Sequence, residues 1–347
     1  MTNIGAVFAN LADVGEPPLI SQLARASWLA GVANSAVKLD ICSKLKDGKR
    51  NSEWMAKQYG ANLLHMRWML NSCVSAGLLE KVGDDEFQNT KESAKYLVKG
   101  APNYYGDAFT YLASLGPLFD KVDTAMLPGH ETTHEEKVQT PEEETAYWTG
   151  YMLAMEQWGG GMQQDMLLEN VDLTGRKKWL DVGCGSGVYT FAVCRKYPNL
   201  KGVLFDQTKA LPLAKSRIKS LGMSDRISTL EGDYYSAPFG NGYDAVLFSG
   251  VLIQESPDGQ KKLMKKAFDA MNSGGIVIVQ DILQIGPYTE TSPKIALESL
   301  VAAVFYGGTG GVVSGDDTVE FLESAGFTRA KQIPLPGVYS LVTAIKP

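Results

Sequence analysis

The chain has 347 residues, of which 44% are hydrophobic, and a formal net charge of −6. This length predicts about two domains with packed cores. The excess of acidic residues argues against nucleic acid as the main partner, because phosphate contacts need clustered Lys and Arg.

Targeting and membrane segments are not predicted. The start, Met1 to Phe8, lacks the basic region and apolar run of a secretory signal, and no stretch approaches about 18 continuous apolar residues. We therefore expect a cytoplasmic protein that does not bind a membrane. Four cysteines lack metal or disulfide spacing and are predicted to be reduced, buried thiols: Cys42, Cys73, Cys184 and Cys194.

The first part of the chain is predicted to be mainly helical. Apolar residues recur at helical spacing from Pro18 onward, and the segments 52–56 and 63–76 predict further helices. Residues 77–87 then predict a hairpin with Asp84 and Asp85 at its tip. Helices followed by a hairpin in this order indicate a winged helix.

A winged helix often binds DNA, but the segment that would read the bases does not suit that role. Residues 62–75 carry Arg67 as the only side chain with a fixed positive charge, whereas Met66, Trp68 and Met69 are bulky and uncharged. DNA binding needs a basic surface there. We therefore predict that this domain does not bind nucleic acid.

Residues 128–145 are rich in Thr, Glu and Pro and predict an exposed connector. They include His130 to His134, which match the zinc-protease motif in letters. That motif requires a buried helix that presents both histidines beside a third ligand. The segment follows Pro128-Gly129 and has no apolar stripe, so we predict a solvated loop and no metal site. The domains are predicted to span 1–145 and 146–347.

Aromatic and sulfur side chains dominate the segment that follows the connector. At helical spacing they present either a buried core face or aromatic surfaces that attract a sulfonium by roughly 0.5 to 2 kcal/mol. These residues are Tyr147, Trp148, Tyr151, Met152, Met155 and Trp158.

A glycine-rich loop follows an apolar strand at residues 179–189. The strand ends in Asp181, and glycines stand at Gly183, Gly185 and Gly187. Alternate glycines allow the chain to wrap closely beneath a ligand. The spacing differs from the Gly-x-Gly-x-x-Gly pattern that serves a pyrophosphate. Asp181 would repel a phosphate and attract an ammonium group instead.

Further polar residues follow the next strands. Lys201 to Phe205 predict a second strand that leads to Asp206, a candidate acceptor for two ribose hydroxyls. A third strand ends near Leu230 and leads to Asp233, a candidate acceptor for an adenine amino group. Such a ligand is cationic, carries a sugar and has no phosphate, which predicts S-adenosylmethionine. The predicted cofactor-binding residues are Asp181, Gly183, Gly185, Gly187, Asp206, Gly232, Asp233, Tyr234 and, after a fourth strand at 243–248, Ser249.

The C-terminal part continues this alternation. A helix is predicted from Ser292 to Tyr306 and another from Asp317 to Ala325, with a closing strand from Val338 to Ile345. The glycine cluster at 307–311 lacks the Lys-Ser/Thr of a phosphate loop. We therefore predict that it only ends the first of these helices.

With these motifs the sequence resembles the class I S-adenosylmethionine-dependent methyltransferases, and more narrowly the plant small-molecule O-methyltransferases and the bacteriochlorophyllide methyltransferase. The likeness extends over nearly the whole chain and is most specific at 181–187, 205–206, 232–233 and 265–275. It implies a doubly wound, Rossmann-like α/β methyltransferase domain. It also implies an N-terminal helical winged-helix domain that forms a homodimer and lends residues to the partner's active site.

The resemblance also exposes a gap in the catalytic residues. In plant members a histidine after the fourth strand deprotonates a phenol, and two glutamates orient it. Aligning residues 265–271 with the family places Ile253 at the histidine. Counting from Gly275 places Asp281 at the first glutamate, and counting back from residues 325–327 places Val312 at the second. The general base is therefore missing. Asp281, Glu255 and Gln254 are the remaining catalytic candidates.

This gap favours an acceptor that needs no deprotonation, because a phenol with a pKa of about 10 is a poor nucleophile near neutral pH. A thioether already has a free electron pair. Among members without the base, the chain resembles the bacterial methylthiohydroxybutyrate S-methyltransferases of dimethylsulfoniopropionate synthesis. The resemblance implies S-methylation of 4-methylthio-2-hydroxybutyrate, with Gln254 or Glu255 at the acceptor hydroxyl.

The resemblance further implies an acceptor pocket, and two other functions stay open. The predicted acceptor-binding residues are Tyr147, Tyr151, Met155, Trp158, Ile253 and, from the dimer mate, Arg25, which would meet a carboxylate. The first alternative is O- or C-methylation of an aromatic or tetrapyrrole, with Asp281 or Glu255 in place of the base. The second is a regulator that binds the cofactor without transferring a methyl group.

Overall fold

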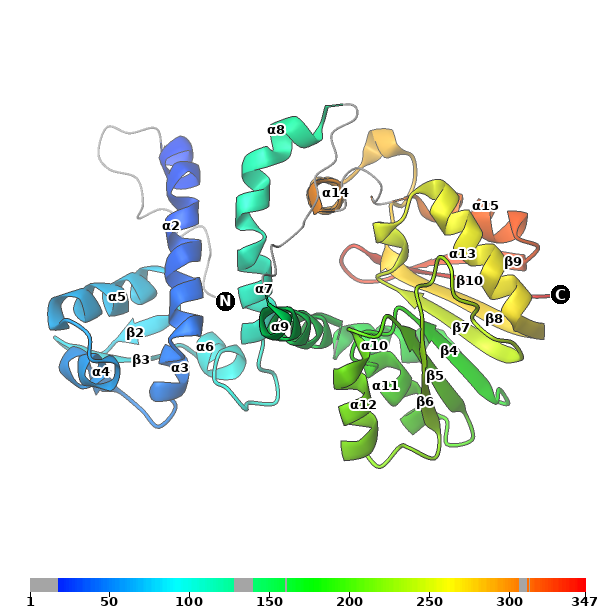
Figure 1. Cartoon of the computed structure of the whole chain (residues 1–347). Coiled ribbons are helices and arrows are strands. Elements are labelled where there is room, and N and C mark those ends of the chain that lie inside the picture. Colours follow the sequence, from blue (N-terminus) through cyan, green and yellow to red (C-terminus); the bar gives the residue numbers. More distant parts are fainter. Residues whose placement is uncertain (1–17, 128–139, 160, 306–310, 312) are drawn as a thin grey trace. The chain divides into compact units, whose positions relative to one another are not determined.

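The computed structural model describes residues 18–127, 140–159, 161–305, 311 and 313–347. The chain forms two compact units, Met1–Leu115 and Gly116–Pro347 (Figure 1). The predicted functional division after residue 145 stays a prediction. The connector's zinc-protease motif at 130–134 and most of the glycine cluster at 307–311 lie outside the described residues.

The first unit combines short helices with a small antiparallel sheet of order β1-β3-β2. Its core gathers Ile41, Met55, Leu70 and Phe87, all nearly inaccessible to solvent. The predicted helices and hairpin are confirmed. The elements are α2 (Pro18–Lys38), α3 (Ile41–Lys44), β1 (Arg50–Asn51), α4 (Ser52–Tyr59), α5 (Leu63–Ser75), β2 (Leu79–Lys81), β3 (Glu86–Asn89), α6 (Lys91–Tyr96) and α7 (Gly106–Ser114).

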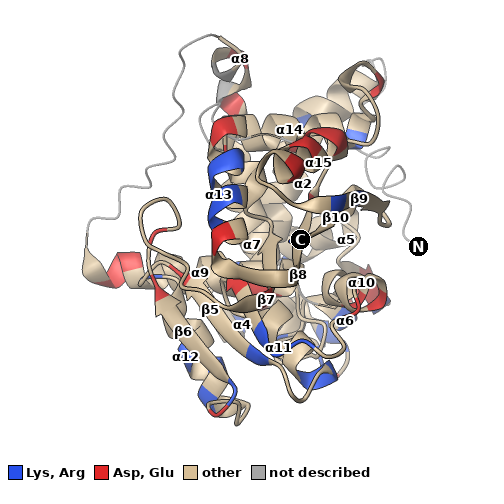
Figure 2. Ribbon diagram, turned by 90° about the vertical axis from the view of Figure 1, so that its right-hand side faces the viewer, with Lys and Arg blue, Asp and Glu red and all other residues tan. Residues whose placement is uncertain are grey.

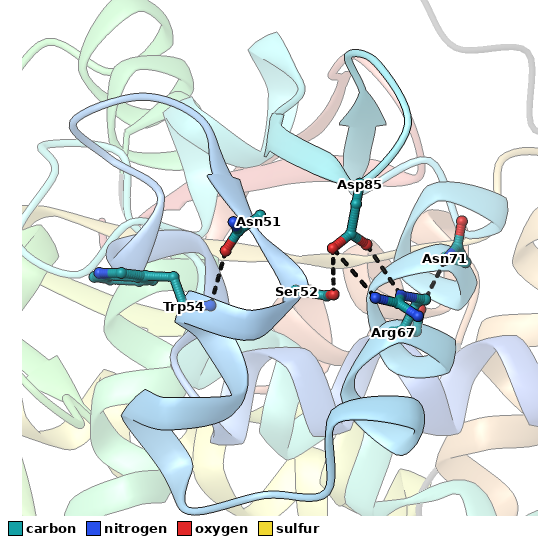
Figure 3. Close-up of polar contacts among 6 residues, drawn as sticks. All are labelled: Asn51, Ser52, Trp54, Arg67, Asn71 and Asp85. Carbon is teal, nitrogen blue, oxygen red and sulfur yellow. Dashed lines mark hydrogen bonds and ion pairs between the residues drawn. The ribbon is translucent and has the colours of Figure 1, made fainter.

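The tip of the hairpin is tied to the helices beneath it (Figure 3). Asp85 accepts a hydrogen bond from the Ser52 hydroxyl at 2.6 Å and an ion-paired one from Arg67 Nε at 3.1 Å. Asn51 caps α4 by accepting from the amide of Trp54 at 2.8 Å. The guanidinium of Arg67 is thus already paired within the unit, which strengthens the charge argument against DNA binding.

The second unit is built on a seven-stranded sheet of order β6-β5-β4-β7-β8-β10-β9. The first five strands in this order, from β6 to β8, pair in parallel. Strand β10 pairs antiparallel with both β8 and β9. The strands are β4 (Lys178–Val182), β5 (Lys201–Asp206), β6 (Ile227–Glu231), β7 (Tyr243–Ser249), β8 (Met271–Ile282), β9 (Thr328–Pro334) and β10 (Tyr339–Ile345). The mixed sheet confirms the predicted α/β class.

Helices cover both faces of this sheet (Figure 1). The described helices of this unit are η1 (Gly116–Lys121), α8 (Val122–Ala125), α9 (Pro141–Gly159), α10 (Met162–Asn170), α11 (Val188–Lys196), α12 (Leu211–Ser220), η2 (Leu252–Gln254), α13 (Pro257–Ala270), η3 (Tyr288–Glu290), α14 (Pro293–Phe305) and α15 (Gly315–Ser324). The alternation of β4 explains the two layers: Trp179 packs with α10 and α11, whereas Leu180 packs with α13 and α15. Figure 2 shows that α13 carries basic and acidic residues and that α15 carries acidic ones.

Strand β9 is not predicted by the sequence pattern. Its residues Thr-Arg-Ala-Lys-Gln-Ile-Pro are half-buried or exposed, because β9 is an edge strand that pairs only with β10. Edge strands commonly carry charges and proline, which conceals the apolar alternation. No described helix combines the length and apolar character that crossing a bilayer requires.

Candidate active site

The glycine loop between β4 and α11 takes the predicted close turn. Gly183, Gly185 and Gly187 have φ angles of 68°, 53° and 84°, which favour glycine. A Cβ on Gly183 would lie 2.6 Å from a methyl of Val251, and one on Gly187 would lie 2.9 Å from Leu204. At Gly185 a Cβ would meet only the sulfur of Met152, at 3.6 Å. These glycines therefore hold the loop tight and leave a backbone surface suited to a ligand.

Asp206 at the end of β5 is anchored to this loop. Its Oδ2 accepts a hydrogen bond from the amide of Gly185 at 2.8 Å, and its Oδ1 accepts one from Gln207 at 2.8 Å. A carboxylate offers about four acceptor positions, so two stay available for vicinal hydroxyls. Burial raises the pKa of Asp206, although both backbone bonds oppose the shift.

Asp181 lies beneath the loop in a buried chain of hydrogen bonds. The Thr190 hydroxyl donates to Asp181 at 2.7 Å and accepts from the Trp179 indole at 2.9 Å. Burial raises the pKa of Asp181 to about 7. A cationic ligand nearby would favour the ionised form.

Two predicted residues, Glu255 and Tyr234, contact each other. The Tyr234 hydroxyl donates to Glu255 Oε1 at 2.6 Å, and the Tyr235 hydroxyl donates to its two oxygens at 2.7 and 2.5 Å. The neighbouring Asp233 is exposed and accepts from the amide of Tyr235 at 2.8 Å. Sequence reasoning missed Tyr235, although it directly follows the predicted Gly-Asp-Tyr segment.

Asp281 supports the turn that follows β7. Its Oδ2 accepts from the amides of Leu252 and Ile253 at 3.1 and 3.2 Å, and its Oδ1 accepts from Ile282 at 2.9 Å. Burial raises the pKa of Asp281 to about 6. Both carboxylate oxygens therefore hold backbone in place. Gln254 in the same turn donates its side-chain amide to the carbonyl of Gly250 at 2.9 Å.

Ile253 lies on an apolar wall. It packs with Ile282, Ile295 and Val338, together with the ring of Tyr339. An aliphatic side chain at this position has no proton-accepting group, whichever acceptor binds. The second glutamate position, Val312, lies outside the described residues.

Helix α9 brings aromatic side chains to the glycine loop. The rings of Tyr147 and Tyr151 are stacked, with centroids 6.3 Å apart and planes within 6°. Burial raises the pKa of the Tyr151 hydroxyl, and the hydroxyl of Tyr147 and the charge of Asp206 add to the shift. Met155 and Trp158 are half-buried on the same helix. Their contacts with an acceptor stay predictions.

A hydrogen-bonded network behind α9 was missed from the sequence. The Tyr189 hydroxyl donates to Gln163 Oε1 at 2.8 Å, and Gln163 Nε2 donates to the Tyr339 hydroxyl at 2.9 Å. Ser249, a predicted cofactor residue, bonds Tyr189 from the end of β7. Burial raises the pKa of Tyr339 to about 12. These residues lie far apart in sequence, so no local pattern signals them.

The remaining predictions concern Arg25, metal binding and the four cysteines. Arg25 belongs to α2 of the first unit, where its guanidinium lies 5.7 Å from the ring centroid of Trp28, and its proposed reach to a partner's acceptor stays a prediction. Within the described part of the chain, no three His, Cys, Asp or Glu side chains are placed to hold a metal. All four cysteines are buried, as predicted.

A cavity of about 940 Å³ lies elsewhere on the second unit. It is lined by residues that precede or begin β4, β5 and β6, including Lys177, Lys201 and Arg226. Ligands of open α/β sheets bind at the carboxyl ends of the strands, and this cavity lies at the amino ends. We therefore assign the candidate active site to the glycine-loop edge.

Comparison with known proteins defines the family. A model of the O-methyltransferase domain matches residues 131–328, more than half of the chain, which therefore belongs to this family. The chain is 28% identical over 345 residues to 3-hydroxy-5-methyl-1-naphthoate 3-O-methyltransferase of Streptomyces sahachiroi, covering 95% of both proteins. It is 30% identical over 184 residues to bacteriochlorophyllide d C-20 methyltransferase of Chlorobaculum tepidum, covering 52% of this chain and 53% of that protein.

Solved structures share the fold. Human N-acetylserotonin methyltransferase in complex with S-adenosylmethionine superposes with a TM-score of 0.83 at 20% identity, over 96% of this chain and 99% of that chain. The protein is an S-adenosylmethionine-dependent methyltransferase. The close glycine turn and the acceptor-rich strand ends fit this cofactor.

Proposed function

We propose that the protein transfers a methyl group from S-adenosylmethionine to an oxygen or carbon atom of a small aromatic molecule. The stacked pair of Tyr147 and Tyr151 carries this proposal, because flat aromatic surfaces suit a flat acceptor and the charge of Asp206, the proposed ribose acceptor, acts on the Tyr151 hydroxyl. Two relatives support it, since their names describe methylation of a naphthoate and of a bacteriochlorophyllide.

In this proposal the cofactor contacts come from the strand ends. Asp206 binds the ribose hydroxyls, Asp233 accepts the adenine amino hydrogens, and Asp181 attracts the ammonium of the methionine end. The loop glycines, Gly232 and Ser249 provide close backbone approach and a hydroxyl at the same edge. The free acceptor positions of Asp206 support its role.

Ile253 limits the acceptors that this site can methylate. Asp281 and Glu255 each accept three hydrogen bonds within the protein and are almost inaccessible to solvent, so a weakly acidic phenol would lack an exposed base. We therefore favour a nucleophilic ring carbon or a hydroxyl that is already ionised near neutral pH.

S-methylation of a methylthio 2-hydroxy acid is the second candidate. The absence of an imidazole at Ile253 favours it, because a thioether has no proton to lose. Arg25 of a dimer mate would meet the acceptor carboxylate. No relative named above is described as acting on a thioether.

A panel assay separates these candidates. Purified protein is incubated with methyl-labelled S-adenosylmethionine and with naphthols, catechols, phenols of graded pKa and thioethers that include 4-methylthio-2-hydroxybutyrate. We expect label on acidic hydroxyls or ring carbons and none on the thioethers. Label on the thioether alone would reverse the order of the candidates, and cofactor binding without label on any acceptor would favour a regulator.

The Ile253→His variant tests the role of the missing base, with Ile253→Val as its matched control. We expect the histidine to raise the rate on phenols of pKa about 10 by roughly 10²-fold or more, with little change for acidic ones. Equal rates for both kinds of phenol in the native protein would contradict a base-free site.

We propose that the first unit is a winged-helix domain through which the protein forms a homodimer. Large apolar side chains are exposed on α2 and α5, including Leu23 (65% exposed), Trp28 (63%) and Trp68 (57%). Exposed apolar groups that gather on neighbouring helices are typical of a protein interface. Since these helices contact each other, a second copy of the chain is the proposed occupant.

A further inference from the structure

Glu255 joins two loops at the carboxyl edge of the sheet. The first loop, residues 232–237, follows β6 and carries Asp233. The second, residues 250–255, follows β7 and ends at Glu255. Glu255 is only 3% exposed, and it accepts hydrogen bonds from the hydroxyls of Tyr234 and Tyr235 at 2.5 to 2.7 Å. The two loops are therefore clamped together by one carboxylate.

The Glu255 carboxylate is held by hydrogen bonds at the start of a helix, and no cation pairs with it in the described part of the chain. Among the ion pairs of the described residues, none involves Glu255. Its carboxylate instead lies at the start of α13, a helix of 14 residues capped by Ser256. A Cβ on Gly259 would lie 2.6 Å from Glu255 Oε2. The positive end of the helix dipole thus faces the carboxylate, and Gly259 provides the space for it.

The clamp extends to Asp233 through Tyr235. The hydroxyl of Tyr235 donates to Glu255, and the backbone amide of Tyr235 donates to Asp233 Oδ1 at 2.8 Å. The amide of Ala237 donates to the Asp233 carbonyl at 2.8 Å, and Lys266 binds the carbonyls of Tyr234 and Ala237. The side chain and backbone of Asp233 are both fixed by this arrangement, although Asp233 itself is exposed.

We propose that Glu255 is a positioning residue for cofactor recognition: through Tyr234 and Tyr235 it holds Asp233 where a carboxylate accepts the 6-amino hydrogens of adenine. The site then prefers a 6-amino purine to a 6-oxo purine, because only the former donates hydrogen bonds from that position. This inference rests on the proposed assignment of adenine to Asp233.

Calorimetry with two ligands tests the proposal. S-adenosylhomocysteine and its inosine analogue differ only at purine position 6 and its neighbouring ring nitrogen. For the native protein we expect at least a tenfold preference for the adenosine ligand. Glu255→Gln and Tyr235→Phe should weaken binding of the adenosine ligand by about tenfold. They should weaken binding of the inosine ligand by less than about threefold.

Gly259→Ala provides an independent variant, since it displaces the Glu255 carboxylate without removing any hydrogen-bonding group. We expect it to lower the same preference. Tyr288→Phe is the matched control: it removes another tyrosine hydroxyl that donates to a carboxylate, Asp317, at 2.8 Å. Its preference should equal that of the native protein.

Four results would overturn the proposal, and each is distinguishable from the others. Native preference in Glu255→Gln and Tyr235→Phe would remove the positioning role. Equal weakening of both ligands, with a lower melting temperature, would reduce Glu255 to a structural role. Native preference in Asp233→Ala would instead reject the assignment of adenine to Asp233. Unchanged binding with a lower kcat in Glu255→Gln would make Glu255 catalytic.

Discussion

Three aspartates of the second unit, the buried Asp181 and Asp281 and the half-buried Asp206, illustrate how one side chain serves different purposes. Asp206 accepts two backbone amides, Asp281 accepts three, and Asp181 accepts a threonine hydroxyl. Burial raises the pKa of each. The number of amide donors decides how much acceptor capacity remains for a ligand.

Asp206 tests the ribose assignment. Asp206→Ala removes the hydroxyl acceptor and the bond to Gly185, so we expect S-adenosylhomocysteine binding to weaken by roughly 1 to 3 kcal/mol. Calorimetry measures this. Asp206→Asn keeps one acceptor and should lose less. Native affinity in the alanine variant would contradict the assignment.

Asp181 predicts a pH dependence of ligand binding. Because the pKa of Asp181 is about 7, its carboxyl group is protonated below pH 7 in the ligand-free protein. The ammonium group of a bound ligand would favour the ionised form. Binding of S-adenosylhomocysteine should therefore strengthen by up to about tenfold per pH unit as pH rises toward 7, then level off. Calorimetry in buffers of different ionisation enthalpy should detect proton release below pH 7.

The Asp181→Asn variant serves as the control, because it cannot ionise. Its binding should be weaker and nearly independent of pH. Stability gives a second readout: the folded pKa is raised above the reference value of 3.8, so the native state holds a proton that the unfolded state has lost. Stability from this group should fall as pH rises from about 4 to about 7. An identical pH profile in both proteins would contradict the prediction.

At the level of elements, the turn η2 depends on a residue of the neighbouring strand. Asp281 at the end of β8 binds the amides of Leu252 and Ile253, and Gly311 donates to the Ile253 carbonyl at 2.9 Å. The position of Ile253 on the apolar wall is thus set by residues outside its own loop.

Asp281→Ala would leave these amides without an acceptor in a buried site. We expect a loss of roughly 1 to 3 kcal/mol in the free energy of unfolding and a lower kcat, with cofactor affinity almost unchanged. Denaturant unfolding and calorimetry measure the two effects. If kcat falls while stability stays native, Asp281 acts on the acceptor directly.

The sequence predicted some elements better than others, for physical reasons. Strands β4, β5 and β7 are buried on both faces and appear as continuous apolar runs, and caps such as Asn51 and Asn62 mark the starts of helices. Edge strand β9 lacks such a run. The loop acids were found because parallel strands end at one edge, but their partners come from distant segments and were not.

On the scale of the whole molecule, a dimer is the main prediction. Replacing Trp28 and Trp68 by Glu places charges on the exposed apolar faces of α2 and α5, so we expect the dissociation constant to rise by more than about 10²-fold. Sedimentation measures this. Leu221→Glu, at an exposed apolar residue of the second unit, is the control. A native protein that is monomeric at micromolar concentration would contradict the proposed interface.

The whole-molecule comparison also explains the limits of the functional prediction. The fold and cofactor follow from local motifs, which the family match supports. The apolar wall around Ile253 combines Ile282 of β8, Ile295 of α14 and Tyr339 of β10, whose meeting requires the tertiary structure. A missing histidine in the sequence narrows the chemistry without naming the acceptor.

The row of hydrogen bonds from Trp179 through Thr190 to Asp181 has a practical consequence. The indole is 0% exposed, and its N–H points into this row, so any change of charge on the aspartate alters the electric field across the ring. Fluorescence from this one tryptophan should shift in wavelength when a ligand binds, and subtracting the spectrum of Trp179→Phe isolates the signal. The fluorescence of Trp179 should therefore report whether a ligand occupies the cofactor site.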